Sequence, residues 1–378
     1  MCVTLLHIGV TMSSENIKVT VVMPVYNAYD YLRPALDSII CQTFTELELI
    51  CVDDGSTDRS LHILKEYQEK DSRVRIITET NAGPSIARNK GLDRSRGEFI
   101  LFFDADDFAE PTLIEKLYNR AVEDNLDIAV AKYDIYNDKK ATFEGVIRSD
   151  HGEIFDSNRV VSKATHPNEI LQCTTMYVWN KLFRKSFLKE KGLCFDPELR
   201  VFEDAYFMVT ALSLASAIGK VHEVLVHHRV YSDQAKKKLF RKYYRQVPEI
   251  YARGRAFLMS HGMYKPLSQS FLNLSASRYY KIYNMLWRDA KEEFYNLYHN
   301  EYAEKLAWDT ANASDFESKE VLDFVANTIM YTYKQYKKRD DKGQNVRIDR
   351  VGPYLRFKEK MDKFKAIFKK KPKDDYII

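Results

Sequence analysis

Two carboxylates separated by a single residue follow the apolar run 99–103. Asp104 and Asp106 flank Ala105, and alternate residues of an extended segment point to the same side, so both side chains can face one ion. Oxygen-only ligation suits Mg²⁺ or Mn²⁺, and such an ion neutralises the charge of a departing diphosphate. On spacing alone, the alternative that these aspartates cap a turn or a helix is equally good.

A second acidic pair, Asp53 and Asp54, precedes Gly55-Ser56-Thr57. This sequence is typical of a turn, and Asp58 could cap the helix that follows. In the functional alternative, one of the two aspartates accepts a hydrogen bond from the imide N–H of a uracil base. Tyr26, at the end of another apolar run, could then stack on that base or simply pack at a strand end.

The dipeptide Gly83-Pro84 predicts the start of a helix, because proline is favoured at the first helical position. The backbone amides there, with Arg88 one turn later, could face an anionic diphosphate. The alternative is an ordinary helix with Arg88 in solvent. No G-x-G-x-x-G follows the first predicted strand and no G-x-x-x-x-G-K-[ST] occurs anywhere, which disfavours a dinucleotide-dependent dehydrogenase and a P-loop NTPase.

The elements that must position these residues alternate along the first third of the chain. Strands are predicted at 19–25, 47–52, 74–78, 99–103 and 127–131, and helices at 31–41, 60–69, 85–94 and 113–123. This order predicts an α/β fold, a Rossmann-like parallel sheet with helices on both faces. Ligands bind beyond the carboxyl ends of strands in such sheets, and each polar cluster follows a strand. An edge strand is predicted near 221–230, and long helices are predicted within 267–352.

Four blocks of sequence, taken in order, closely resemble the glycosyltransferases of family 2. They are Pro24-Val25-Tyr26-Asn27, Val52-Asp53-Asp54-Gly55-Ser56-Thr57-Asp58, Asn81-Ala82-Gly83-Pro84-Ser85-Ile86-Ala87-Arg88-Asn89-Lys90-Gly91 and Phe103-Asp104-Ala105-Asp106-Asp107. The blocks 179–185 and 202–207 look like later parts of the same family, so the resemblance covers roughly 18–232. It implies a GT-A type fold, inverting transfer and a nucleoside-diphosphate sugar donor, most often a UDP-sugar.

The resemblance also implies roles for individual residues. The positions that correspond to nucleotide binding are Pro24, Tyr26, Asn27, Asp53, Asp54, Asn81, Arg88, Asp104 and Ala105. Asp104 and Asp106 fall at the motif that binds the cofactor ion, Mn²⁺ or Mg²⁺. Asp204 falls at the catalytic base, with Glu203 as its immediate competitor.

The match is weaker at 227–232, where many relatives have an aromatic-Arg sequence near the phosphates. There His228 or Arg229 would complete the diphosphate site, and His228 is also a candidate metal ligand. The alternative for His228 is a structural role at a strand end. Trp179 could wall the acceptor or sugar pocket, or it could belong to the core.

Composition sets limits on the remaining classes. The 378 residues are 45% hydrophobic and 30% charged, which is near the globular average. Five scattered cysteines favour neither a zinc site nor a disulfide framework, so we expect a cytoplasmic protein. No apolar stretch reaches the length of a membrane span, and the first ten residues lack the basic region of a signal peptide.

We expect an N-terminal extension at 1–17, a glycosyltransferase domain at 18–232, a helical region at 233–352 and a basic amphipathic tail at 353–378. Residues 334–378 carry 16 Lys and Arg against 7 Asp and Glu, although the whole chain has a net charge of only +4. Tail residues three and four apart form one apolar stripe: Tyr354, Phe357, Met361, Phe364 and Phe368. The tail is therefore either a helix packed on the protein or one lying on an anionic membrane surface.

The predicted partners are a UDP-sugar donor and a glycan or lipid-linked glycan acceptor, as in bacterial surface-polysaccharide assembly; no nucleic acid is expected. Two other classes stay open at this point. A nucleotidyltransferase would share the acidic metal ligands, but it would need a Gly-rich loop with Arg or Lys where this chain has Pro24-Val25-Tyr26-Asn27. A noncatalytic glycan- or membrane-binding module would have no need of intact acidic clusters.

Overall fold

The computed structural model describes residues 17–146, 159–230 and 240–343. The chain divides into two compact units, of which the first ends at Gln246 and the second begins at Val247. The domain boundary predicted after residue 232 falls in the segment 231–239, outside the described residues. The basic tail predicted at 353–378 and residues 1–16 of the N-terminal extension also lie outside them.

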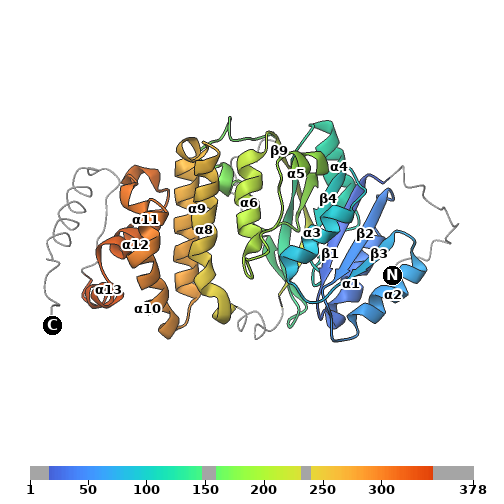
Figure 1. Ribbon diagram of the computed structural model, residues 1–378, viewed down its shortest axis with the longest axis horizontal. Helices are drawn as coiled ribbons and strands as arrows, with labels where there is room; N and C mark the ends of the chain where they lie inside the picture. The colour runs from blue at the N-terminus through green and yellow to red at the C-terminus, as the bar shows by residue number, and fades with distance from the viewer. Residues whose placement is uncertain (1–16, 147–158, 231–239, 344–378) are drawn as a thin grey trace, which may run out of the picture. The chain divides into compact units, whose positions relative to one another are not determined.

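Four parallel strands form one half of the sheet of the first unit (Figure 1). In the order β3-β2-β1-β4 they are β3 (Val74–Thr78), β2 (Leu47–Asp53), β1 (Val19–Val25) and β4 (Phe99–Phe102). Helices α1 (Tyr29–Ile40), α2 (Ser60–Lys70) and α3 (Pro84–Arg94) make the connections. All of β2 and β4 is buried, and apart from Glu48 and Asp53 of β2 these strands consist of apolar residues, as expected of strands that are covered on both faces. The predicted Rossmann-like α/β fold is confirmed.

The other half of the sheet is mixed, where a parallel arrangement was predicted. It continues β4-β8-β6-β9-β5, and β7 pairs with β6. The strands are β5 (Phe108–Ala109), β6 (Ile128–Asn137), β7 (Thr142–Val146), β8 (Lys181–Arg184) and β9 (Ile218–Val230). β8 is antiparallel to both of its neighbours, and a run of four residues carries no signal of strand direction. β9 pairs with β6 on one side and with the short β5 on the other, so it is not the edge strand predicted.

The remaining helices of the first unit follow these strands. They are α4 (Leu113–Glu123), η2 (Ile170–Gln172), α5 (Lys185–Glu190), α6 (Glu203–Leu214) and η3 (Tyr244–Gln246). Helix α6 begins immediately after Phe202, a bulky residue in the left-handed conformation with φ of 54°. That conformation is strained for such a side chain, and strain of this kind is concentrated at functional sites.

At the amino ends of the strands, a buried carboxylate ties β1, β2 and β3 together. Glu48 in β2 is 1% exposed and accepts hydrogen bonds from Thr20 Oγ1 (2.7 Å), Arg75 Nη1 (2.7 Å) and both the backbone N (2.7 Å) and Nε (2.8 Å) of Arg96. Burial raises the pKa of Glu48, but these hydrogen bonds outweigh it and hold the pKa below its usual value. We call these four residues the Glu48 network.

At the carboxyl ends of the strands, Asn27 joins the loops after β1 and β2. It lies in the left-handed region with φ of 49°, and its Oδ1 accepts the Thr57 N–H at 2.8 Å. Its own backbone N–H donates to Ser56 Oγ at 3.1 Å. Asn27 tolerates this conformation better than most residues because its short polar side chain bonds locally. The loops that carry the predicted site are therefore fixed to one another.

The second unit is helical, as predicted, and has its own aromatic core. Its helices are α8 (Val247–Ser260), α9 (Tyr264–Met285), α10 (Arg288–Leu297), η4 (Tyr298–Tyr302), α11 (Ala303–Lys305), η5 (Trp308–Thr310), η6 (Ala313–Asp315), α12 (Lys319–Met330) and α13 (Tyr333–Asp340). The ring of Tyr279 lies 3.9 Å from that of Tyr298 and 5.0 Å from that of Phe324, measured between centroids. None of the helices in the described residues combines the length and apolar character needed to cross a membrane.

Candidate active site

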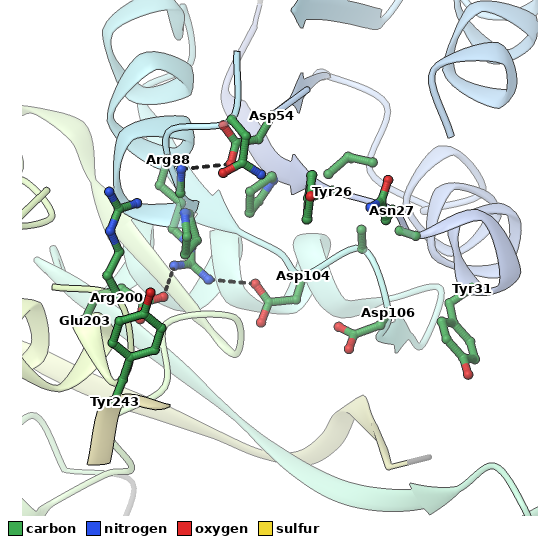
Figure 2. Close-up of a pocket in the computed structure, with 17 residues that line it drawn as sticks. Tyr26, Asn27, Tyr31, Asp54, Arg88, Asp104, Asp106, Arg200, Glu203 and Tyr243 are labelled. Carbon is green, nitrogen blue, oxygen red and sulfur yellow. Dashed lines mark hydrogen bonds and ion pairs between the residues drawn. The ribbon is translucent and has the colours of Figure 1, made fainter. Parts of the chain in front are cut away.

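A cavity of about 870 Å³ opens at the carboxyl ends of β1, β2 and β4 (Figure 2). Ten of the predicted site residues line it: Pro24, Tyr26, Asn27, Asp54, Asn81, Arg88, Asp104, Ala105, Asp106 and Glu203. Five residues that the sequence analysis named for the site are not among the lining residues, namely Asp53, Trp179, Asp204, His228 and Arg229. The sequence blocks that are far apart along the chain thus converge on one cavity.

Arg88 joins the acidic residues of this cavity. Its Nη2 donates to Asp104 Oδ1 at 2.9 Å, and its Nη1 donates to Glu203 Oε1 at 2.7 Å (Figure 2). The same Nη1 lies 3.3 Å from Asp204 Oδ1. Arg88 is 4% exposed, and although burial disfavours its charged form, the three carboxylates outweigh that effect and raise its pKa. We call Arg88, Asp104, Glu203 and Asp204 the Arg88 cluster.

The Arg88 cluster has more carboxylates than cations, and this affects Asp204. The pKa of Asp204 is raised to about 7. Burial is the largest cause, the charges of Glu203 and Asp104 act in the same direction, and the charge of Arg88 opposes them. Glu203 faces the cavity, whereas Asp204 lies beside it on the first turn of α6. The predicted base and its predicted competitor therefore share one arginine.

Asp54 shapes the wall of the cavity through the backbone. Its two oxygens accept the N–H groups of Ala82 (2.7 Å) and Gly83 (2.9 Å), which fixes the loop before α3. Gly83 has a φ of 96°, a conformation that other residues rarely adopt. Asp53 is 3% exposed and is not among the residues that line the cavity, whereas Tyr26 is 51% exposed and lines it. Asp53 thus belongs to the buried end of β2, and Asp54 belongs to the cavity.

Asp104, Asp106 and Asp107 place oxygen atoms within 4.8 Å of one another. Asp107 is completely buried, accepts the Arg229 backbone N–H at 2.9 Å and pairs with His228 Nδ1 at 3.0 Å. Burial raises the pKa of Asp107 to about 6, and the neighbouring His228 opposes this shift. Asp104 and Asp106 are partly exposed and face the cavity, so their carboxylates fit a hard divalent cation. The carboxylate of Asp107 is instead hydrogen-bonded to His228 and Arg229 of β9.

His228 and Trp179 form a stacked pair behind this loop. Their ring centroids are 5.1 Å apart and the planes differ by 9°. Trp179 is 1% exposed and therefore belongs to the core, the second of the two alternatives that its sequence position allowed. His228 lies outside the group of candidate metal-binding oxygens, against Asp107.

Comparison with known proteins places the chain among glycosyltransferases. Residues 20–192 match the sequence model of glycosyl transferase family 2. The chain is 31% identical over 274 residues to the putative glycosyltransferase EpsH of Bacillus subtilis, an alignment that covers 70% of this chain and 76% of EpsH. This chain belongs to glycosyl transferase family 2. It is a glycosyltransferase, and the nucleotidyltransferase no longer stands as an alternative.

Two further similarities extend over part of the glycosyltransferase. It is 35% identical over 215 residues to glycosyltransferase GlyA of Streptococcus pneumoniae, covering 56% of this chain and 30% of GlyA. It is 33% identical over 209 residues to the poly(ribitol-phosphate) beta-glucosyltransferase of Bacillus spizizenii, covering 53% of this chain and 30% of that protein. The aligned region therefore spans less than a third of the length of these two relatives.

Among solved structures, residues 1–349 of S. aureus TarS in complex with UDP-GlcNAc superimpose on the glycosyltransferase with a TM-score of 0.67. The sequence identity is 23%, and the match covers 88% of this chain and 94% of the TarS chain. At this identity the likeness establishes the fold, which is the GT-A type that the sequence predicted.

The cavity of this glycosyltransferase also contains residues that the sequence did not single out. Arg200, Tyr243 and Tyr31 line it. Arg200 Nη1 donates to the Ala82 carbonyl at 2.8 Å, so it braces the same loop that Asp54 holds. Its position four residues before Asp204 was the one available signal, whereas Tyr243 lies in a Lys- and Arg-rich segment without a recognisable motif.

Proposed function

We propose that this glycosyltransferase transfers a sugar, with inversion at the anomeric carbon, from a UDP-sugar to a hydroxyl group of a glycan or lipid-linked glycan. The observation that carries the proposal is the Arg88 cluster, in which one guanidinium joins Asp104 and Glu203, which line the cavity, to Asp204, the residue that follows Glu203 in α6. An in-line displacement needs charge control at the leaving diphosphate and a base at the attacking hydroxyl. The two ends of the Arg88 cluster match these two needs.

The proposed donor site uses the upper wall of the cavity in Figure 2. Tyr26 would stack on the uracil ring, because its own ring is half exposed at the cavity. Each carboxylate oxygen of Asp54 already accepts one backbone N–H and retains a second lone pair, which would accept the uracil imide N–H. Because the amide groups of Ala82 and Gly83 hold Asp54 in place, the donor would meet a carboxylate that needs no reorganisation.

In the proposed transfer the acceptor oxygen attacks the anomeric carbon, and a new glycosidic bond forms as the bond to the β-phosphate oxygen breaks. UDP leaves with that electron pair, and Asp204 accepts the proton of the acceptor hydroxyl. A carboxylate with a pKa raised to about 7 is a stronger base near neutral pH than an ordinary aspartate. Glu203 pairs with Arg88 at 2.7 Å and keeps the guanidinium beside both of its other partners.

Asp104 and Asp106 would hold the Mn²⁺ or Mg²⁺ ion, whose charge neutralises the departing diphosphate when it is bound. The fit rests on the oxygen-only donor set of these residues, on their exposure to the cavity, and on the cluster's excess of carboxylates over cations. Arg88 orients Asp104 through its 2.9 Å hydrogen bond. We include His228 among the residues that support this loop, not among the ligands.

For the acceptor, we propose a polymer of the bacterial cell envelope, because the glycosyltransferase is similar to a poly(ribitol-phosphate) beta-glucosyltransferase. We further propose that the protein is cytoplasmic and peripheral at the membrane, held there by the basic tail 353–378. Sedimentation with anionic and neutral vesicles, comparing the full chain with one that ends at Gly352, tests this part. Equal and salt-insensitive behaviour of both proteins would contradict a membrane role for the tail.

The proposed reaction is tested by incubating the full chain with a panel of UDP-sugars and Mn²⁺ and measuring released UDP. We expect one sugar to be hydrolysed or transferred clearly faster than the others, and excess EDTA to abolish the release. Asp106→Ala serves as the matched inactive variant. Full release in EDTA would contradict the metal, whereas the absence of both UDP binding and UDP release would contradict the donor class.

A further inference from the structure

Two consecutive residues of β9 hold the loop that carries the carboxylates proposed to bind the metal. His228 and the backbone N–H of Arg229 both contact Asp107, and the Arg229 side chain reaches back to Asp106. β9 pairs antiparallel with the short β5, so the loop between Asp104 and Phe108 is held from the neighbouring strand. The contacts of the Arg229 side chain indicate a structural role at this loop.

The guanidinium of Arg229 is enclosed on several sides. Its Nε donates to the Asp106 carbonyl at 3.0 Å, and its Nη1 pairs with Asp138 of the β6–β7 turn. Three aromatic rings surround its Cζ, with centroid distances of 5.5 Å for Tyr31, 5.1 Å for Phe108 and 5.3 Å for Tyr136. The Arg229 side chain is 11% exposed.

These contacts do not suit the role that sequence resemblance suggested for Arg229, which was to complete the diphosphate site. The guanidinium faces Asp138 and the three rings, and Arg229 is not among the residues that line the cavity. What it does touch is the backbone of Asp106, the residue proposed as a metal ligand. A planar guanidinium that is fixed by a carboxylate and by ring faces is well suited to hold a carbonyl in one direction.

We propose that Arg229 is a positioning residue that sets the metal affinity of the Asp104–Asp106 loop by fixing the Asp106 backbone. The inference rests on the proposed function in one respect, namely that Asp104 and Asp106 bind the ion. Holding the Asp106 carbonyl limits rotation of the peptide that carries the Asp106 side chain, so the carboxylate is presented to the ion in one orientation. Partners of this kind, beyond the ligands themselves, commonly contribute 10- to 100-fold to metal affinity, roughly.

Arg184 offers a matched control in the same unit. Its Nε donates to the Leu126 carbonyl at 3.0 Å, its Nη1 lies 3.3 Å from Glu98, and its Cζ lies 4.7 Å from the Phe99 ring centroid. It therefore combines a backbone carbonyl, a carboxylate and an aromatic ring, as Arg229 does, but it does not line the cavity. Substitution by lysine at either position keeps the charge and removes the planar guanidinium from a carbonyl, a carboxylate and a ring face, and of the two only Arg229 contacts the proposed metal loop.

The experiment measures Mn²⁺ binding to the full chain by the electron paramagnetic resonance signal of free Mn²⁺, with melting temperature and UDP release recorded alongside. Arg229→Lys keeps the charge and loses the planar fork, so we expect Mn²⁺ affinity to fall about 10-fold. UDP affinity without metal should stay unchanged. Asp138→Asn should weaken Mn²⁺ binding in the same direction by a smaller factor, and Arg184→Lys should lower only the melting temperature.

Wild-type Mn²⁺ affinity in both Arg229→Lys and Arg229→Gln would overturn the inference, as would an equal loss in Arg184→Lys. If the wild type transfers sugar and binds Mn²⁺, and the Arg229 variants bind Mn²⁺ with the same affinity, the proposed function stands and only this inference is wrong. If Asp106→Ala binds Mn²⁺ as tightly as the wild type does, the metal site of the proposed function is wrong, and this inference is wrong with it.

Discussion

Two buried networks of arginine and carboxylate lie at opposite ends of the same parallel strands, and their stoichiometry differs. In the Glu48 network, one carboxylate accepts hydrogen bonds from two arginines and a threonine, and the pKa of Glu48 is held below its usual value. In the Arg88 cluster, one arginine serves three carboxylates, and the pKa of Asp204 is raised to about 7.

The comparison separates a group that stabilises the fold from one that is prepared for chemistry. A carboxylate with all its lone pairs occupied has nothing left to offer a ligand or a proton. A cluster with excess negative charge attracts a cation and retains a base, and perturbed pKa values of this kind mark functional sites. Both networks are buried and both pair arginine with carboxylate, so what distinguishes them is the number of carboxylates relative to the number of arginines.

Removing a carboxylate that we propose binds the metal is the change with the largest expected effect. We expect Asp106→Ala to lower sugar transfer by roughly 100-fold or more, because the diphosphate loses its cation, while the melting temperature stays near that of the wild type. Glu48→Gln should behave in the opposite way, costing about 2 kcal/mol of stability with little loss of activity in the folded protein. Steady-state rates and thermal unfolding of both variants decide whether the two networks differ in this manner.

The next largest effect is expected at the shared arginine. Arg88→Lys keeps one positive charge but cannot contact all three carboxylates, so transfer should fall roughly 10- to 100-fold.

In the wild type, kcat/KM should rise as pH increases through about 7, because Asp204 must lose its proton to act as the base. Since Arg88 lowers the pKa of Asp204, the variant should need a higher pH to reach its own maximum. A pH profile with an unshifted acid limb would argue against this coupling.

A smaller effect is expected from the exposed ring at the donor site. Tyr26→Ala should weaken UDP binding by about 5- to 10-fold, the low end of the ~1–3 kcal/mol that stacking of a base on an aromatic side chain contributes. Tyr26→Phe retains the ring and should bind UDP as the wild type does. Isothermal titration with UDP measures both variants, and equal affinities for alanine and phenylalanine would remove Tyr26 from the site.

The smallest effect concerns the pH dependence of stability, where the two networks should have opposite signs. Glu48 has a lowered pKa, so its contribution is present at neutral pH and is lost as the pH falls through its folded pKa. Asp204 has a raised pKa, so the folded state binds a proton that the unfolded state releases, and stability falls as pH rises toward 7. We expect Glu48→Gln to lower the melting temperature more at pH 7 than at pH 4. Asp204→Asn should raise it at pH 8, and shifts of the same sign in both variants would contradict the comparison.

The alternation of strands and helices up to residue 131 could be predicted from sequence because each element there is local and strongly patterned. The strands β1 and β3 have the predicted bounds, and the polar loops after them meet as expected. β8 was missed because its place between β4 and β6 is set by contacts with residues about 50 to 80 positions away, not by its own four residues.

Ten residues of the cavity could be named from sequence, but the contacts that each one makes within the protein could not. Arg88 was expected at a diphosphate, which stays a prediction, but its pairing with Glu203 and Asp204 could not be foreseen because these two partners come from a helix more than 100 residues later. Asp54 was expected at the uracil base, which stays a prediction, but its hydrogen bonds to the Ala82 and Gly83 amides could not be foreseen because a motif does not reveal loop geometry. Arg200 carried no motif, and only the folded chain brings it to the cavity.

The central claim, that the Arg88 cluster holds the base for transfer, is tested most directly by Asp204→Asn. This change keeps the size of the side chain and removes its ability to accept a proton. UDP-sugar affinity and single-turnover transfer are measured for Asp204→Asn and Glu203→Gln in parallel. The account predicts unchanged donor affinity with a transfer rate lowered by roughly 100-fold or more in Asp204→Asn. Wild-type transfer by Asp204→Asn, with the loss found in Glu203→Gln instead, would contradict it.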